Sequence, residues 1–374
     1  MPKGLPDISD YQYTHEYELA IPLIDSCNMA CDFCFENQKG KITEEENDKI
    51  MAILPRVIEY MKPIIKDGFY NRIDLKLWGG ELFFDALPDW IFDTYRKFIF
   101  ELEKALPVPF TIVFLSNGMF EKYDRVDKLL SDVNGNISIS YDPVGRYKND
   151  KQRETFLRSL AHFKETGKLE SVSVTLTKPT MEAYVKGDTI YDTYIPDNLQ
   201  VIVNFYVPNS SWKEYVPSWE DYYNYYKWAI KNYHFNIDVV NNIMMYMVPE
   251  QRDSIRKMCN CKEATQYVPW LKRCSANCIN DRVLDMDYKK FFYGKFNDEV
   301  TNENHFEVRS SLARIKNHCL YCEHFKHCPM MCPTSIVFSE YDASHCPIKK
   351  IYEEITDDEI EAFKEWQKKY NLFG

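Results

Sequence analysis

The feature that most constrains the fold is an alternation of strand-like apolar runs with helical patterns over residues 18–205. The predicted strands are residues 18–25, 72–78, 111–115, 137–141, 172–176 and 199–205. The predicted helices between them are residues 43–61, with a break or kink at Pro55, and residues 89–106, 123–131, 151–166 and 180–194. Strands that alternate with helices of this length indicate βαβ units and a parallel sheet. Roughly six units are too few for a closed eight-unit barrel, so we predict an α/β fold with a partial (β/α)6 barrel.

The rest of the chain lacks this rhythm. Residues 206–258 are rich in aromatics and contain a predicted helix over 219–231, residues 259–350 are rich in cysteine, and residues 351–374 form a predicted terminal helix that begins with a Thr356 to Glu359 capping box. Residues 1–17 form an N-terminal extension to the barrel domain, which covers residues 18–205. A Tyr and Trp stripe at helical spacing is more often core packing than a peptide anchor, so we favour packing for residues 212–228.

The charge balance limits the partners of the protein. Its 374 residues carry a formal net charge of -11, which opposes general binding to nucleic acid or to an anionic membrane. Residues 1–10 lack an apolar segment of signal-peptide length, and no apolar run reaches membrane-spanning length. We therefore expect a cytoplasmic location, with neither nucleic acid nor membrane as partner.

The distribution of the twelve cysteines indicates two metal regions. Cys27, Cys31 and Cys34 lie close together, and the other nine fall between Cys259 and Cys346. In a chain without a secretion signal, such clusters favour metal ligation over disulfides, because the cytosol keeps thiols reduced.

The first cysteine group follows the first predicted strand directly, at the edge of a parallel sheet where α/β folds build their sites. Three thiolates can hold three corners of an iron-sulfur cubane and leave the fourth iron open, whereas a structural zinc site is closed by a fourth ligand. The alternative is a zinc site completed by a distant residue such as His15.

The CxxxCxxC spacing of this group, with Phe33 before the third cysteine, resembles the signature of the radical S-adenosylmethionine superfamily. The resemblance implies one four-iron cluster on Cys27, Cys31 and Cys34, with S-adenosylmethionine on its open iron. It also implies that polar motifs at the next three strand ends bind that cofactor. The matching positions are Gly79, Gly80, Glu81, Ser116, Asn117, Ser140, Asp142 and Arg153, with Arg146 as the alternative arginine.

The second cysteine region spells CxxCxxxxxCxxxC and resembles the SPASM extension of peptide-modifying radical enzymes, which carries two auxiliary iron-sulfur clusters. The resemblance assigns Cys319, Cys322, Cys328 and Cys346 to the distal cluster. It assigns Cys332 to the proximal cluster, together with cysteines from the set Cys259, Cys261, Cys274 and Cys278. Two arrangements fit these cysteines: a proximal cluster with four protein ligands and no open iron, or one spare cysteine that acts in catalysis. Zinc sites of the CxxC kind are the alternative to iron-sulfur clusters.

The resemblance implies an enzyme that forms a 5'-deoxyadenosyl radical and abstracts hydrogen from a peptide side chain. The reaction that we predict first is the formation of a thioether or carbon-carbon crosslink in a ribosomally made peptide. The alternatives are formylglycine formation of the anaerobic sulfatase-maturase type and a non-catalytic iron-sulfur or zinc protein. Expected partners are a peptide or protein substrate and a flavodoxin or ferredoxin as reductant. The 26 residues before Cys27 are too few for the leader-binding module of many relatives, so leader recognition is expected to use a separate protein, the aromatic segment 212–228, or nothing. No catalytic base is assigned.

Overall fold

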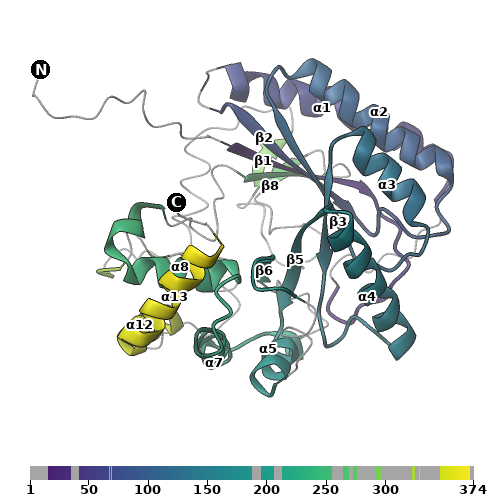
Figure 1. The fold of residues 1–374 in the computed structure, drawn as a ribbon. Helices are drawn as coiled ribbons and strands as arrows, with labels where there is room; N and C mark the ends of the chain where they lie inside the picture. Colours follow the sequence, from purple (N-terminus) through teal and green to yellow (C-terminus); the bar gives the residue numbers. More distant parts are fainter. Residues whose placement is uncertain are drawn as a thin grey trace, which may run out of the picture.

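The described part of the chain is a curved sheet with helices on one face and a second helical layer beside it. The computed structural model describes residues 16–34, 42–66, 68, 70–187, 195–205, 213–254, 264–268, 273–275, 292–295, 322–324, 328 and 346–370. Figure 1 shows the helices that connect the strands on the outer side of the sheet, and the C-terminal helices gathered apart from them.

Six parallel strands form the centre of the structure, and consecutive strands are neighbours. They are β1 (Glu16–Ile24), β2 (Arg72–Gly79), β3 (Phe110–Ser116), β4 (Asn136–Ser140), β5 (Leu169–Leu176) and β6 (Gln200–Phe205). Because each crossover adds its strand to the same edge, and such crossovers share one hand, the connecting helices cover one face and leave the other open. The predicted partial barrel is therefore confirmed.

Three short strands extend this sheet beyond β1. They are β7 (Ala264–Val268), β8 (Arg273–Ser275) and β9 (Phe292–Lys295). β7 runs parallel to β1, whereas β8 and β9 pair antiparallel. They come from the cysteine-rich region, so its beginning is joined to the barrel through backbone hydrogen bonds.

The connecting helices follow the predicted order, but the helix predicted over 180–194 ends at Val185, and the prediction at Pro55 also differs from the structure. These helices are α1 (Glu45–Lys66), α2 (Asp89–Ala105), α3 (Tyr123–Asp132), α4 (Asp150–Glu165) and α5 (Lys178–Val185). The sequence predicts a kink or a break at Pro55; a break is wrong, because α1 runs through both Pro55 and Pro63. Both prolines lie on the exposed side of α1, where water can bond the carbonyl groups that lack an N–H partner.

The strands divide their side chains between an apolar outer face and a partly polar inner face. On β2, Ile73, Leu75 and Leu77 are fully buried, while the alternate residues Asp74 and Lys76 are half-buried. Successive side chains of a strand point to opposite faces, so the apolar set packs under the helices. The polar set lines the open, concave face, which is thus chemically suited to hold a polar ligand.

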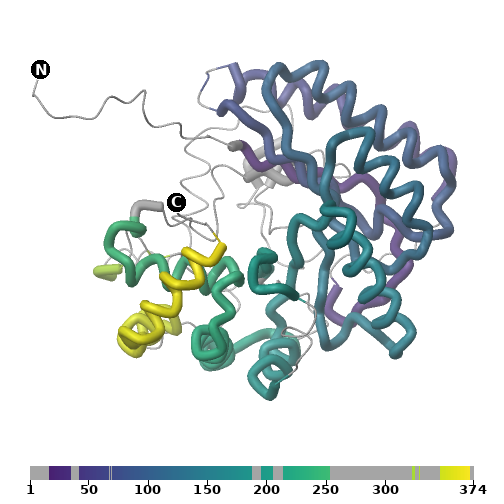
Figure 2. The backbone as a smooth tube through the Cα atoms, viewed as in Figure 1, coloured from purple at the N-terminus to yellow at the C-terminus, as the bar shows by residue number. Residues whose placement is uncertain are grey.

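A second helical layer joins the middle of the chain to its end. It comprises the helices η2 (Lys213–Tyr215), α7 (Trp219–Lys231), α8 (Asp238–Met247), η3 (Pro249–Ser254), α12 (Pro347–Glu354) and α13 (Asp357–Lys369). Figure 2 shows the C-terminal helices lying against this middle segment. Glu354 accepts hydrogen bonds from Tyr223 at 2.6 Å and from Lys227 at 2.6 Å, and Phe235 packs on Phe363 with ring centroids 5.2 Å apart.

The aromatic segment packs inside this layer. Trp219, Tyr222, Tyr225 and Tyr226 are buried, as expected for core packing rather than for an exposed peptide anchor. Helix α7 has the predicted bounds, and the predicted capping box at Thr356 and Glu359 is formed.

Much of the cysteine-rich region falls outside the described residues. These include Cys259, Cys261, Cys278, Cys319 and Cys332, and only the backbone of Cys274, in β8, is described. Within the described ranges, no helix combines the length and the apolar character that crossing a bilayer requires.

We expect Asp238→Asn to stabilise the protein at pH 8. Burial raises the pKa of Asp238 to about 7, although its side chain accepts hydrogen bonds from the Val203 and Val239 amides at 3.1 and 2.7 Å. The folded state therefore keeps a proton that the unfolded chain releases near pH 4, so stability falls as the pH rises from about 4 to 7.

An asparagine oxygen can accept the same two hydrogen bonds without carrying a charge. Denaturant unfolding at pH 5 and pH 8 should show a gain of about 1–3 kcal/mol at pH 8 and a smaller gain at pH 5, where only part of the loss has occurred. An equal effect at both pH values would contradict the burial of an ionisable carboxyl at this position.

Candidate functional site

The first cysteine group forms a loop directly after β1. Cys27, Cys31 and Cys34 are each half-buried free thiols. The Met29 amide donates to Cys27 Sγ at 3.4 Å, and the buried side chains of Met29 and Phe33 anchor the loop in the protein. The predicted position of the group, at the carboxyl edge of the sheet, is confirmed.

The electrostatic setting of the three thiols suits binding to a cationic group. Burial raises the pKa of Cys27 to about 12, and Glu81, Cys31 and Cys34 add to the effect. Burial also raises the pKa of Cys31, against the opposing charge of Arg146. Thiolates are the form that ligates metal, so the raised pKa values of Cys27 and Cys31 fit a site in which bound iron would stabilise the negative charge.

The described thiols do not form a site for a single metal ion. Across the described ranges, no three His, Cys, Asp or Glu side chains converge on a point where a single ion would sit. In an iron-sulfur cubane each thiolate binds a different iron, so the ligands need not share one centre. His15, the candidate fourth ligand of a zinc site, lies outside the described residues.

Gly79 and Gly80 lie where the cysteine loop leaves β1. The Gly80 amide donates to Ile24 O at 2.9 Å, and the Glu81 amide donates to Ser26 O at 2.8 Å. A Cβ on Gly79 would lie 2.2 Å from Ile24 O, and one on Gly80 would lie 2.2 Å from Ser26 O. The two glycines therefore allow the backbone after β2 to lie directly against the backbone of residues 24–26, at the base of the cysteine loop.

Glu81 is buried and joins the ends of β2 and β3. Its carboxylate accepts hydrogen bonds from the Phe83 amide at 3.0 Å, from Ser116 Oγ at 2.8 Å and from the Asn117 amide at 2.6 Å. Burial raises the pKa of Glu81 to about 7, while these donors oppose the shift. A carboxylate has about four acceptor sites, so roughly one is left for a ligand ammonium group.

The turn after β3 holds the cysteine loop from a second side. Asn117 Nδ2 donates to Asn28 Oδ1 at 2.9 Å and lies 3.8 Å from Cys27 Sγ, and Asn28 Nδ2 donates to Met119 O at 2.6 Å. The role of Asn28 was missed from the sequence, although its place directly after Cys27, in a turn beside a second polar turn, is a usable signal. Ser116 and Asn117 are thereby brought to the site.

The loop after β4 contacts the cysteine loop from a third side. Buried Asp142 accepts hydrogen bonds from the Arg146 guanidinium at 2.7 and 2.5 Å and from the Thr175 amide at 2.6 Å. The Arg146 guanidinium lies 5.6 Å from the Phe33 ring centroid, and its charge opposes the rise that burial causes in the pKa of Cys31. Asp142 therefore fixes Arg146 in place against the cysteine loop.

The two candidate arginines differ in position. Arg146 has a side chain that is 11% exposed and faces the loop, whereas Arg153 is exposed in the first turns of α4. The cysteine loop is also joined to this region by the Asp32 amide, which donates to Gly145 O at 2.9 Å, and by a Lys148–Asp32 ion pair. Geometry favours Arg146 for an anionic ligand beside the cysteines.

The inner face of β4 and β5 carries paired hydroxyl groups. Ser140 Oγ lies 3.1 Å from Ser173 Oγ, and Ser138 Oγ lies 2.8 Å from Ser171 Oγ. Ser140 is half-buried at the end of β4 that is nearer to Asp142. Hydroxyl groups both donate and accept, so this row suits a polar ligand on the concave face.

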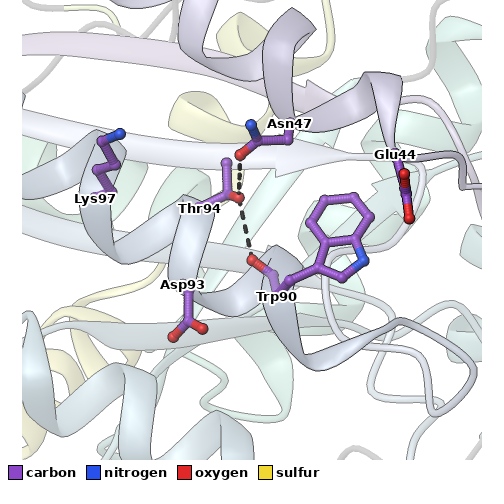
Figure 3. Close-up of a pocket in the computed structure, with 6 residues that line it drawn as sticks. All are labelled: Glu44, Asn47, Trp90, Asp93, Thr94 and Lys97. Atoms are coloured by element: carbon purple, nitrogen blue, oxygen red, sulfur yellow. Dashed lines mark hydrogen bonds between the residues drawn. The ribbon is translucent and has the colours of Figure 1, made fainter.

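A surface cavity of about 440 Å³ lies on the other side of the sheet, between α1 and α2. Figure 3 shows Thr94 joined by dashed hydrogen bonds to the Asn47 side chain and to the Trp90 backbone. Thr94 Oγ1 bonds to Asn47 Oδ1 at 2.7 Å and to Trp90 O at 3.1 Å, so its hydroxyl is already satisfied within the protein. None of the predicted site residues lines this cavity, and it is not the candidate site.

Three auxiliary cysteines lie in the helical layer. Cys322, Cys328 and Cys346 are half-buried, and the last two pack against the hydrophobic core. Cys346 directly precedes α12, and the Cys328 amide donates to His324 O at 2.9 Å. Three of the four cysteines predicted for the distal cluster thus have described positions, while Cys319 lies outside the described residues.

Solved structures share this architecture. The anSMEcpe structure with bound AdoMet and the Kp18Cys peptide has a TM-score of 0.62 at 17% identity, covering 96% of this chain and 100% of that chain. Streptococcus suis SuiB bound to S-adenosylmethionine has a TM-score of 0.53 at 15% identity, covering 89% and 77%. The chain has the fold of these radical S-adenosylmethionine enzymes. At the level of the fold, the resemblance inferred from the cysteine motifs is confirmed.

A second SuiB structure, bound to the precursor peptide SuiA, has a TM-score of 0.51 at 14% identity and covers 89% of this chain and 76% of that chain. Comparisons with protein-family models and with curated protein sequences returned no match.

Gly80→Ala should displace the base of the cysteine loop, because its Cβ would lie 2.2 Å from Ser26 O. We expect a loss of about 1–3 kcal/mol in unfolding free energy. We also expect less iron bound after anaerobic reconstitution. Gly135→Ala is the matched control, since its Cβ would meet only side chains, at 3.2 Å or more. Equal iron content in both variants would contradict a tight contact at the base of the loop.

Glu81→Gln should destabilise the protein even though it keeps the shape of the side chain. The carboxylate accepts from three donors, and an amide NH2 group would turn one of its acceptors into a donor facing another donor. We expect a loss of about 1–3 kcal/mol in chemical denaturation. Ser116→Ala, which removes only one donor, should cost less; a Gln variant as stable as wild type would rule out this bonding.

Proposed function

We propose that the protein is a radical S-adenosylmethionine enzyme that modifies a peptide or protein side chain. The observation that carries the proposal is the convergence of the β2, β3 and β4 ends on the Cys27 to Cys34 loop. When bound, a four-iron cluster would supply the electron that cleaves S-adenosylmethionine to a 5'-deoxyadenosyl radical, which abstracts hydrogen from the substrate.

The described residues have separable roles in this proposal. Cys27, Cys31 and Cys34 would hold the cluster, and three protein ligands leave one iron for the cofactor. Glu81 has roughly one free acceptor site for the ammonium group, and the Arg146 guanidinium would attract the carboxylate. These groups would orient the methionine part of the cofactor at the carboxyl edge of the sheet.

Hydroxyl groups on the concave face would complete the cofactor site. Ser140 pairs with Ser173 through their hydroxyls, and either can rotate its proton toward a ligand. Arg153 remains a second candidate for the carboxylate, from its place in α4. The separate variants Arg146→Lys and Arg153→Lys would show which arginine matters, because only the one that contacts the carboxylate should weaken the binding of S-adenosylmethionine.

A peptide substrate is supported by two similar structures. anSMEcpe was solved with the Kp18Cys peptide and SuiB with the precursor peptide SuiA. The cysteine-rich extension, with Cys322, Cys328 and Cys346 in the helical layer, supports the same substrate class through its SPASM-like spacing. We propose two auxiliary clusters and, as the specific reaction, a thioether or carbon-carbon crosslink in a ribosomally made peptide.

Formylglycine formation is the second candidate reaction. It is favoured by how much of each similar structure this chain covers. The chain covers all of anSMEcpe, an anaerobic sulfatase-maturating enzyme, but about three quarters of SuiB. Against it, Cys274 is followed by Ser275 and Cys278 by Ile279, whereas the sulfatase-maturing type carries an aspartate after an auxiliary cysteine. A flavodoxin or ferredoxin as reductant and a separate leader-recognition protein complete the proposed partners.

The first test is cofactor cleavage by the full chain, reconstituted with iron and sulfide under anaerobic conditions and reduced with dithionite. 5'-Deoxyadenosine should form from S-adenosylmethionine, and the change of Cys27, Cys31 and Cys34 to alanine should abolish it, because no cluster would remain in the barrel. Cys328→Ala is the matched control and should retain cleavage. Cleavage that persists in the triple variant would refute the proposal.

The product is then decided by mass spectrometry of peptide treated with the active enzyme. A loss of two hydrogens with a crosslink supports crosslinking, whereas a new aldehyde supports formylglycine formation. Candidate peptides are short, cysteine-containing or aromatic-containing sequences encoded beside the gene of this protein.

A further inference from the structure

A group of stacked aromatic side chains surrounds the described auxiliary cysteines. Tyr246 of α8 and Tyr352 of α12 stack with ring centroids 4.1 Å apart and an interplanar angle of 26°. Tyr246 Oη lies 2.5 Å from His324 Nδ1, and the His324 ring lies 5.1 Å from the Tyr352 ring. We refer to Tyr246, His324 and Tyr352 as the aromatic triad.

The triad is held firmly by its surroundings. The Arg252 guanidinium lies 4.8 Å from the Tyr246 ring centroid, and its Nε donates to Tyr246 O at 2.7 Å. Tyr352 is 7% exposed and belongs to the hydrophobic core. Its ring therefore has a defined place, and the direction of its hydroxyl is set by packing.

The Tyr352 hydroxyl is the unusual group in the triad. It is buried and has no nitrogen or oxygen partner in the described part of the chain, and the group that acts on it is the Cys328 sulfur. Buried polar groups of functional proteins are almost always hydrogen-bonded, so this hydroxyl is expected to have a strong acceptor in the functional protein. The acceptor must lie in the space that Tyr352 faces.

That space is beside the auxiliary cysteines. The Cys328 amide donates to His324 O at 2.9 Å, and the His324 ring lies 5.1 Å from the Tyr352 ring. Cys346 directly precedes α12, the helix that carries Tyr352. Burial raises the pKa of Tyr352, and the neighbouring Cys328 and Cys346 raise it further. Cluster thiolates and sulfides carry negative charge and accept hydrogen bonds, so they would satisfy this hydroxyl.

We infer that the Tyr352 hydroxyl, positioned by Tyr246 and His324, donates a hydrogen bond to a sulfur of the auxiliary cluster held by Cys328 and Cys346, and so raises its reduction potential. The inference rests on the proposed function for the presence of that cluster. A donor next to a sulfur stabilises the reduced, more negative cluster over the oxidised one. Tyr352 is thus a positioning and tuning residue rather than a catalytic one.

Tyr352→Phe tests the inference, because it removes the hydroxyl and keeps the stacked ring. Redox titration of the reconstituted full chain, followed by electron paramagnetic resonance, should show one auxiliary cluster with a lower potential. We expect about a tenfold change in the reduction equilibrium, equal to about 59 mV for one electron. Iron content and the titration steps of the other clusters should stay the same.

Tyr225→Phe is the matched control. Tyr225 is fully buried in the same helical layer, and its hydroxyl likewise has no nitrogen or oxygen partner in the described part of the chain, but it is not among the groups that Cys328 or Cys346 affects. The control should leave all potentials unchanged. If both variants shift the potential equally, or if Tyr352→Phe shifts none, the inference is wrong.

Tyr246→Ala gives an independent variant, because it removes the stacking partner of Tyr352 from a half-buried site. We expect a shift of the same sign as that of Tyr352→Phe, and an unchanged potential would overturn the positioning role of Tyr246. Wild-type protein that lacks auxiliary iron yet still cleaves S-adenosylmethionine would overturn the inference and leave the proposed function standing. Wild-type protein that neither binds auxiliary iron nor cleaves S-adenosylmethionine would refute the proposed function itself.

Discussion

The candidate site depends on two backbone hydrogen bonds at the base of the cysteine loop. The amides of Gly80 and Glu81 donate to the carbonyls of Ile24 and Ser26, and this fixes the chain one residue before Cys27. The contact requires glycine, since any Cβ would collide with the opposite backbone. From this fixed base, the remaining contacts of the loop need only add orientation.

The other contacts of the loop come from side chains that already form hydrogen bonds within the protein when no ligand is bound. Glu81 and Asp142 are both buried carboxylates, and each joins neighbouring strand ends through hydrogen bonds from the backbone. Because a buried carboxylate is costly unless it is bonded, each locks the turn that donates to it. The polar edge of the sheet is thus preorganised, and binding of a polar cofactor would require little rearrangement.

The barrel was predictable because periodicity and turn chemistry agree along residues 18–205. The grouping of Cys27, Cys31 and Cys34 was predictable from their spacing and their place after the first strand, and the polar strand ends were predictable through resemblance to a known family. The choice between Arg146 and Arg153 was less accessible, because it depends on how Asp142 folds the loop after β4. Pro55 misled the helix prediction, since sequence does not show that its side of α1 faces water. The aromatic triad joins Tyr246, His324 and Tyr352, which are far apart in the chain, so no local sequence pattern predicts it.

The packing of α12 and α13 against α7 and α8 has a consequence for the residues between Ser254 and Cys346. The helices before and after this segment already lie against each other. The entropic cost of closing a loop grows with the logarithm of its length, and here helix packing bears that cost. Under the proposed function, insertion of an auxiliary cluster would therefore take place within a folded protein, and it would need less free iron than a cluster that had to close the loop itself.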